Sequence, residues 1–289
     1  LFVAATLFTM SLIAPLIVLM QSAFLNEQHQ FVGLDNFTAY FSNPALISSI
    51  FNSMWIAITA MLITVSLASV YAFALINCNI RGKAFFKTVA FLPILAPSLL
   101  PSLALVYLFG QQGVFKGMLG EVEIYGPLGI LISYCFWLFP AMVMLMMGAF
   151  RHIDQHLFES SHALGKNTLQ THWAVTFPAI RYGLVSACLV AFTYVITDFG
   201  IPKVIGGSFN MMALDVYKQI IGQQNMNMGA VISILLLCPA VLAFIFDRYQ
   251  SRHQERYQNF QIQPYRLRAN PRIEKALTVF CAVISGGIL

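Results

Sequence analysis

The side chains best suited to chemistry gather in one polar stretch, residues 151–178, of a sequence that is otherwise strongly apolar. The histidines and carboxylates of this stretch are His152, Asp154, His156, Glu159, His162 and His172. His152 and His156 are four residues apart, which on a helix would place two potential metal ligands on one face. Because the stretch has no H-E-x-x-H motif and no cysteine, we interpret these residues as a polar surface, with a metal site as the alternative.

Residue spacing within the stretch predicts a hairpin of two short helices. One side of the first helix would carry Ile153, Leu157, Ser160, Ser161 and Leu164. Gly165 is expected to end that helix, because glycine readily adopts the left-handed conformation of a helix C-terminus.

The second helix can begin at Asn167 or Thr168, whose side chains are suited to cap it. Its apolar residues recur every four positions and are Leu169, Trp173 and Phe177. Pro178 is expected to end this helix and to open the next one.

These residues carry a family resemblance. Glu159-Ser160-Ser161, then Gly165 after three residues and Val175-Thr176-Phe177-Pro178 after nine more, resemble the cytoplasmic loop motif of binding-protein-dependent ABC importer permeases. That motif is E-A-A, three residues, G, nine residues, I-x-L-P; the departures are two Ala-to-Ser changes and two swaps among apolar residues.

In that family the loop docks into a groove on a cytoplasmic ATPase subunit and couples ATP hydrolysis to transport. The resemblance implies that role for Glu159, Ser160, Ser161, Gly165, Trp173, Phe177 and Pro178. It also implies a type I importer bundle of about six transmembrane helices.

Composition independently predicts an all-α polytopic membrane protein. Apolar residues make up 58% of the chain, charged residues only 9%, and mean hydropathy is +0.75. Soluble domains carry about 25% charged residues. The predicted spans are 1–24, 47–77, 85–110, 126–150, 178–197 and 228–246, each long enough for about 30 Å of hydrocarbon.

The basic residues predict the orientation of these spans. All 16 Lys and Arg residues except Lys116, Lys203 and Lys218 fall on the side that carries residues 151–178. The positive-inside rule makes that side cytoplasmic.

Pro93, Pro97 and Pro101 recur every four residues within the third span, so on one helix their rings would share a face. We expect a kinked helix whose proline face points into the protein, near a substrate pathway or a helix interface. Simple tolerance of proline in membrane helices is the alternative.

Asp198 comes 20 residues after Pro178, which places it about 30 Å further along the helix, at the outer boundary of the membrane. A proton relay at mid-membrane is therefore disfavoured. A structural cap on the following loop is preferred to direct substrate contact, although both remain open. The segment from Thr197 to Tyr217 resembles the outer mouth of permeases for 2-aminoethylphosphonate and ferric iron.

The sequence predicts three parts: a six-helix permease domain over 1–247, a basic cytoplasmic linker over 248–275, and the start of a truncated further helix over 276–289. Positive-inside topology explains the basic linker without nucleic acid, and lipid headgroups are its expected neighbours. Some iron and aminoethylphosphonate permeases resemble two six-helix repeats in one chain, so the last segment is expected to begin a second repeat.

The expected function is the translocation subunit of an ATP-driven solute importer in the bacterial inner membrane. The sequence has no G-x-x-x-x-G-K-[ST] loop, so ATP and Mg²⁺ are expected on a separate ATPase subunit and no cofactor in this chain. The other expected partners are a periplasmic solute-binding protein and a second permease half, fused or separate.

Two other classes remain as alternatives. An ion-gradient-driven transporter or channel would call for ionisable residues at mid-membrane, and no predicted span has one near its centre. A membrane-embedded enzyme would use paired acids or histidines, which occur together only in the polar stretch. The expected substrate is 2-aminoethylphosphonate or iron(III), with polyamines, thiamine and sulfate open.

Overall fold

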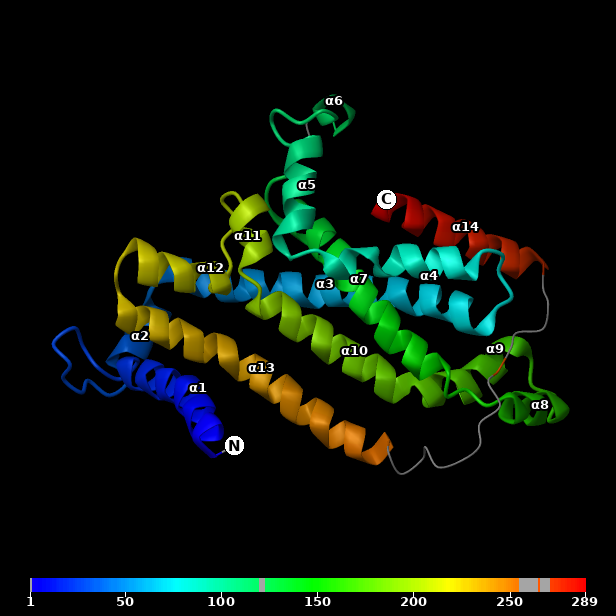
Figure 1. Cartoon of the computed structure of the whole chain (residues 1–289), viewed down its shortest axis with the longest axis horizontal. Helices are drawn as coiled ribbons and strands as arrows, with labels where there is room; N and C mark the ends of the chain where they lie inside the picture. Colours follow the sequence, from blue (N-terminus) through cyan, green and yellow to red (C-terminus); the bar gives the residue numbers. More distant parts are fainter. Residues whose placement is uncertain (1, 120–122, 255–264, 266–270) are drawn as a thin grey trace.

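The computed structural model describes residues 2–119, 123–254, 265 and 271–289, which form helices joined by loops (Figure 1). The first helices are α1 (Phe2–Ser22), α2 (Asp35–Ser42), α3 (Pro44–Asn77), α4 (Lys83–Phe91), the 3₁₀ turn η1 (Leu92–Leu95), α5 (Leu99–Phe109), α6 (Lys116–Leu119) and α7 (Pro127–Phe150). There follow α8 (Gln155–Ala163), α9 (Thr168–Thr171), the π turn η2 (His172–Thr176), α10 (Phe177–Thr197), α11 (Gly200–Ile205), α12 (Met212–Tyr217), the π turn η3 (Lys218–Gly222), α13 (Met226–Gln254) and α14 (Pro271–Ile288). The predicted all-α membrane architecture is confirmed.

Four helical segments are long and apolar enough to cross a membrane: α3, α7, η2 with α10, and α13. They match four of the six predicted spans. The first predicted span forms α1, whose described apolar part, Thr6–Ser22, is shorter than these four.

The third predicted span is not one kinked helix, and that expectation is wrong. Residues 83–95 and 99–109 form two helical segments bent by 99° (Figure 1). Ala96, which precedes Pro97, has an extended backbone (φ −91°, ψ 133°), as the proline ring requires of the residue before it. Pro93 and Pro101 therefore lie on different helices, both half-buried, while Pro97 is exposed at the break.

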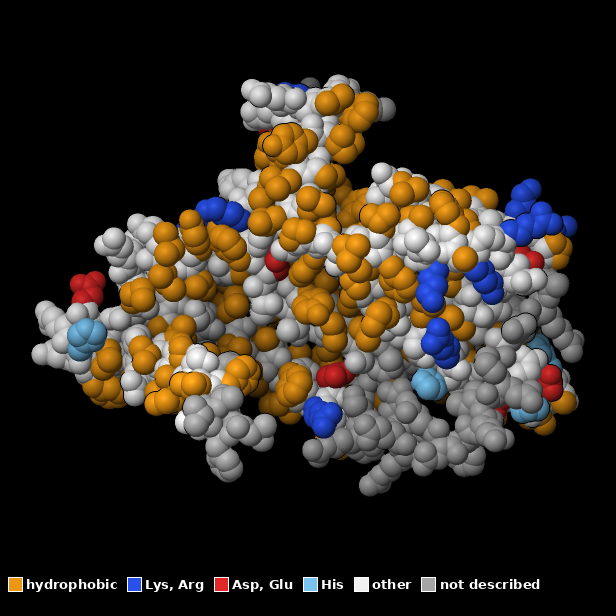
Figure 2. All heavy atoms as spheres, in the orientation of Figure 1, with side chains coloured by type: hydrophobic (Ala, Val, Ile, Leu, Met, Phe, Trp, Pro, Cys, Tyr) orange, Lys and Arg blue, Asp and Glu red, His pale blue; other side chains and the backbone are white. Residues whose placement is uncertain are grey.

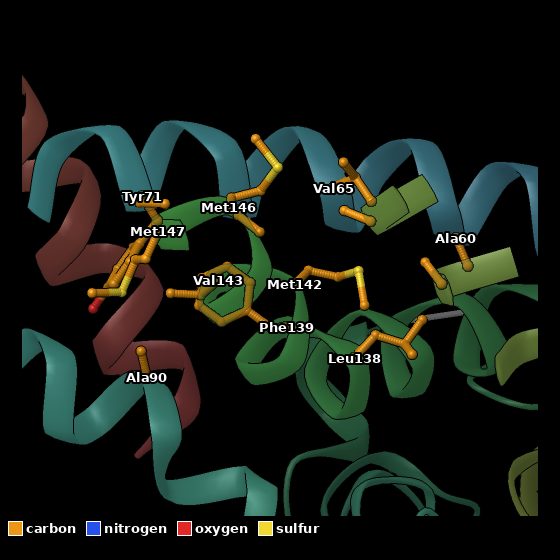
Figure 3. Packing of buried hydrophobic residues seen from close by; sticks show 14 of the residues in the cluster. Ala60, Val65, Tyr71, Ala90, Leu138, Phe139, Met142, Val143, Met146 and Met147 are labelled. Carbon is orange, nitrogen blue, oxygen red and sulfur yellow. The ribbon is translucent and has the colours of Figure 1, made fainter. Parts of the chain in front are cut away.

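The core forms where α3, α7 and α10 pack together. Ala60 and Ala68 of α3 are fully buried, and their small side chains let α7 approach closely. Leu138, Met142 and Met146 of α7 are buried in the same cluster (Figure 3). This packing fixes the long helices from which the polar hairpin emerges.

Tyr71 of α3 ties two further helices to this core. Its hydroxyl donates to the Phe86 carbonyl of α4 at 2.8 Å and lies 2.9 Å from Ser285 Oγ of α14. A hydroxyl has one proton to donate, so Ser285 is the donor in the second bond. α14 thus packs on α3 and α4, although it follows them by almost 200 residues of sequence.

Helices extend into both ends of the predicted linker over 248–275. α13 continues to Gln254, and α14 begins at Pro271 rather than near residue 276. Within that interval, residues 255–264 and 266–270 lie outside the described part, and Tyr265 inside it.

Apolar and basic side chains are distributed differently over the surface. Figure 2 shows apolar side chains over most of the body, as expected for a protein surrounded by lipid. The Lys and Arg side chains seen in that view lie mainly over the half of the molecule that carries α4, α8, α9 and the start of α14.

Candidate functional site

The polar stretch forms the predicted hairpin, and its first helix has a well-defined end. Asp154 caps α8 by accepting a hydrogen bond from the His156 N–H at 3.1 Å. At the other end Gly165 has φ +79°, the left-handed conformation predicted for it. The Gly165 N–H donates to His162 O at 2.9 Å and the Lys166 N–H to Ser161 O at 3.3 Å, which completes a Schellman motif.

The second limb begins with a capping box. The Gln170 N–H donates to Asn167 Oδ1 at 2.9 Å, and the Asn167 N–H donates back to Gln170 Oε1 at 3.1 Å. Asn167 is therefore the cap, one of the two residues predicted. The buried hydroxyls of Ser161 and Thr171, 3.1 Å apart, join the two limbs.

Pro178 does not end the second helix, contrary to the prediction. α9, η2 and α10 follow one another without a break from Thr168 to Thr197. The Phe177 N–H donates to His172 O across the π turn, directly before the proline. Since Pro178 lies at the start of α10, where its missing N–H is tolerated, the helix passes through it.

The residues predicted to share one side of the first helix differ in burial. Ile153 and Ser161 are buried, whereas Leu157 is 56% and Leu164 79% exposed. Phe158, which the spacing did not single out, is the buried anchor, with its ring 5.2 Å from that of His172.

The outward face of the hairpin combines apolar and polar residues. Trp173 is 64% exposed, and its ring contacts the half-exposed ring of Phe177 at 5.4 Å. Glu159 is also exposed, and its Oε1 accepts from Gln155 Nε2 at 3.0 Å. The Ser160 hydroxyl donates back to its own helix, to His156 O at 2.8 Å. Large apolar side chains exposed on a polar segment are typical of a protein interaction surface.

The histidines of the hairpin make separate local contacts. His156 Nδ1 lies 4.0 Å from Glu159 Oε2, His162 Nδ1 lies 3.2 Å from Lys166 O, and His172 Nδ1 lies 2.9 Å from Thr176 Oγ1. Within the described part of the chain, no three His, Cys, Asp or Glu side chains converge as a metal site would require.

Asp198 lies at the opposite end of α10, and its carboxylate caps α11. Asp198 Oδ2 accepts from the Ile201 N–H at 2.9 Å and from the Tyr134 hydroxyl at 3.3 Å. α11 packs against α5, and a Cβ on Gly200 would lie 2.7 Å from Ser98 Oγ. The loop that Asp198 holds therefore lies against the break near Pro97.

A polar cluster around the buried Asp215, which no sequence pattern predicted, lies in the segment between α11 and η3. Asn210 donates from Nδ2 to Asp215 Oδ1 and accepts from Lys218 Nζ at 2.7 Å. Asp215 is 3% exposed. The pKa of Tyr40 is raised to about 12, mainly because Tyr40 is itself buried, and the charge of Asp215 raises it further. The apolar runs around Asp215 gave no local signal that its side chain is buried.

Residues 65–256 match the family described as "Binding-protein-dependent transport system inner membrane component". The match extends from within α3 to the end of α13 and includes the whole hairpin.

Individual relatives belong to several transport systems. The chain is 30% identical over 184 residues to the "Ferric transport system permease protein FbpB" of Actinobacillus pleuropneumoniae, covering 60% of this chain and 27% of the relative. It is 24% identical over 251 residues to the "Spermidine/putrescine transport system permease protein PotB" of Haemophilus influenzae, covering 82% of this chain and 87% of the relative. The chain spans less than a third of the length of this ferric permease, 27%, and of a second one from Haemophilus influenzae, 30%.

Among solved structures, the chain is similar to one in the crystal structure of a bacterial alginate ABC transporter in complex with an alginate pentasaccharide-bound periplasmic protein. The TM-score is 0.68 at 15% identity, covering 90% of this chain and 94% of that one. The fold is thus that of a type I ABC importer permease, as the loop motif indicated. The chain belongs to the family of binding-protein-dependent transport system inner membrane components, and several of its helices are long and apolar enough to cross a membrane.

Proposed function

We propose that this chain is the translocation subunit of an ATP-driven importer and that the α8–α9 hairpin is its coupling element. The observation that carries this proposal is the hairpin itself, a stiff projection that exposes Leu157 and Leu164 to a partner. The Schellman motif, the capping box and the Ser161–Thr171 contact hold its two limbs in one shape. The partner is an ATPase subunit that carries ATP and Mg²⁺.

Motion of the hairpin would reach the membrane through α10. Because α9, η2 and α10 are continuous, a displacement of the hairpin moves the base of a long helix packed on α3 and α7. A rigid-body movement of this kind can turn a cavity from inward-facing to outward-facing. The π turn at His172–Thr176 is the point in that lever where the helix geometry is irregular.

The hairpin is proposed to face the cytoplasm. The excess of Lys and Arg on its side of the molecule supports this orientation through the positive-inside rule. The opposite end, with Asp198, Lys203 and Lys218, would then face a periplasmic solute-binding protein.

A second permease half is proposed to complete the pathway. α5 projects from the body (Figure 1) and exposes Leu100 and Tyr107, so its surface offers apolar area to such a half. The much greater length of the ferric relatives supports a fused second half that begins with α14, after the six-helix domain predicted over 1–247 and a linker that ends where α14 starts.

We propose iron(III) as the substrate. Two of the relatives are named as ferric transport permeases, and the segment from Thr197 to Tyr217 resembles the outer mouth of permeases for ferric iron and 2-aminoethylphosphonate. The phosphonate has support from that segment alone, so it is the second candidate.

Uptake into proteoliposomes tests both parts of this proposal. The full-length native protein is reconstituted with its ATPase subunits and binding protein, and radiolabelled iron(III) or 2-aminoethylphosphonate is supplied outside. The proposal predicts iron uptake that requires ATP and the binding protein. Uptake of the phosphonate alone would overturn the substrate, and uptake without the ATPase that follows an ion gradient would overturn the importer.

A further inference from the structure

Tyr265 is held between two elements that are far apart in the sequence. It lies between the end of α13 and the start of α14, and only 5% of its surface is exposed. Its N–H donates to the carbonyl of Ile153, just before α8, at 3.0 Å. Its carbonyl accepts from Nδ2 of Asn77, the last residue of α3, also at 3.0 Å. One residue thus bridges the base of the hairpin and the end of α3.

The Tyr265 ring adds a second connection to the hairpin. It stacks on the Phe158 ring with centroids 3.7 Å apart and planes 18° from parallel. The His172 ring presents an edge to it at 6.3 Å and 82°. Phe73 of α3 contacts the other side of this group, 5.9 Å from His172. Stacked and edge-to-face pairs favour a single arrangement of the rings.

Within the described part of the chain, the hairpin helix α8 makes its main contacts inside the hairpin. α8 packs mainly on α9 and η2, which belong to the same hairpin. α10 carries the other limb into the membrane, and the contacts of Tyr265 and Phe73 connect the hairpin to the end of α3. A buried Asn77 side chain would also lose its hydrogen bond if Tyr265 moved away.

We propose that Tyr265 is a positioning residue for coupling, which locks the hairpin to α3 so that one displacement moves α3 and α10 together. This inference rests on the proposed role of the hairpin as the ATPase-coupling element. Without the lock, the ATPase can still bind and move the hairpin, but part of the movement no longer reaches α3. Hydrolysis then continues with less transport per ATP.

The test measures ATP hydrolysis and solute uptake in the same proteoliposomes, with the full-length transporter, its ATPase subunits and its binding protein. Tyr265→Ala removes the ring, and Tyr265→Phe retains it. Tyr249→Ala is the matched control, because Tyr249 lies on α13 near the same segment and is 66% exposed. We expect Tyr265→Ala to retain the ATPase subunits and to lower the solute imported per ATP by at least about fivefold. The Tyr265→Phe and Tyr249→Ala variants should keep the wild-type ratio.

Two results would overturn the inference. One is an unchanged ratio in Tyr265→Ala. The other is a fall of hydrolysis and uptake in proportion to the ATPase retained, which a merely structural role would produce. The proposed function is judged separately, by whether Leu164→Asp releases the ATPase while Tyr265 is intact.

A distance measurement checks the lock without ATP. Spin labels at Lys166→Cys on the hairpin and Arg81→Cys beyond α3 report how firmly the two parts are joined, in a background where Cys135, Cys188 and Cys238, which are not buried, are replaced by Ala. We expect a narrow distance distribution with Tyr265 and a clearly broader one with Tyr265→Ala. Equal widths would contradict the proposal.

Discussion

The Ser161 and Thr171 hydroxyls, 3.1 Å apart, form a buried hydrogen bond between the two limbs of the hairpin. The loop motif of the family has Ala where this chain has Ser161, so the departure from the motif comes with a polar partner. Removing one hydroxyl leaves the other buried without that partner.

We predict that Ser161→Ala and Thr171→Val each destabilise the transporter by about 1 kcal/mol, because each leaves an unpaired buried hydroxyl. The double variant should be less destabilised than the sum of the two, since neither hydroxyl remains. Thermal unfolding of the purified protein measures all three. Strictly additive losses would show that the two hydroxyls do not interact.

Gly165→Ala should loosen the end of α8, because a left-handed backbone costs a residue with a Cβ about 1–2 kcal/mol. The space around Gly165 is open, so the cost comes from backbone conformation and not from a clash. Faster hydrogen exchange of the amides in residues 155–171 would report it. Gly165→Asn is the control, since asparagine tolerates this conformation, and its exchange should stay near that of the native protein. Equal exchange in both variants would contradict the assignment.

Two variants of Asp198 distinguish a structural role from a role in substrate contact. Asp198→Ala removes the cap on α11 and should lower stability by about 1 kcal/mol, with a loss of uptake. Asp198→Asn keeps an oxygen that can accept the Ile201 N–H, so a structural role predicts nearly native uptake. If Asp198→Asn keeps its stability but loses uptake, the charge itself acts on the substrate.

Local sequence signals predicted the features of the hairpin that local chemistry controls. Gly165 ends α8 through its own left-handed backbone conformation, as a glycine is expected to do. Asn167 caps the second limb through its own side chain, as an asparagine is expected to do. Local signals did not predict which side of α8 is buried. Phe158 is inside because His172 and Tyr265 surround it, and Tyr265 is too distant in the sequence for helical spacing to reveal the contact.

Pro97 and Pro178 illustrate the same limit. The helix breaks at Pro97 because the proline ring favours an extended backbone at Ala96. Helical periodicity alone had predicted one helix across this position. At Pro178 the sequence predicted that the helix ends, whereas the helix continues into α10 through the π turn before the proline. No residue pattern gives the 99° bend, which is set by packing of α5 against α7 and α11.

Binding of the ATPase to the hairpin is the measurement closest to the central claim. Leu164→Asp places a charge on the residue that follows α8, its C-cap, which is 79% exposed, so the fold should tolerate it. Val114→Asp is the matched control, because Val114 is 81% exposed but lies between α5 and α6. The full-length variants are purified from cells that co-express the ATPase subunits, and the ATPase retained per permease is quantified.

We predict that Leu164→Asp loses at least about nine-tenths of the bound ATPase, equivalent to about 1.4 kcal/mol or more of binding free energy, with native folding. Val114→Asp should retain it. Full retention of the ATPase by Leu164→Asp, or equal loss in both variants, would contradict the account of the hairpin as the coupling element.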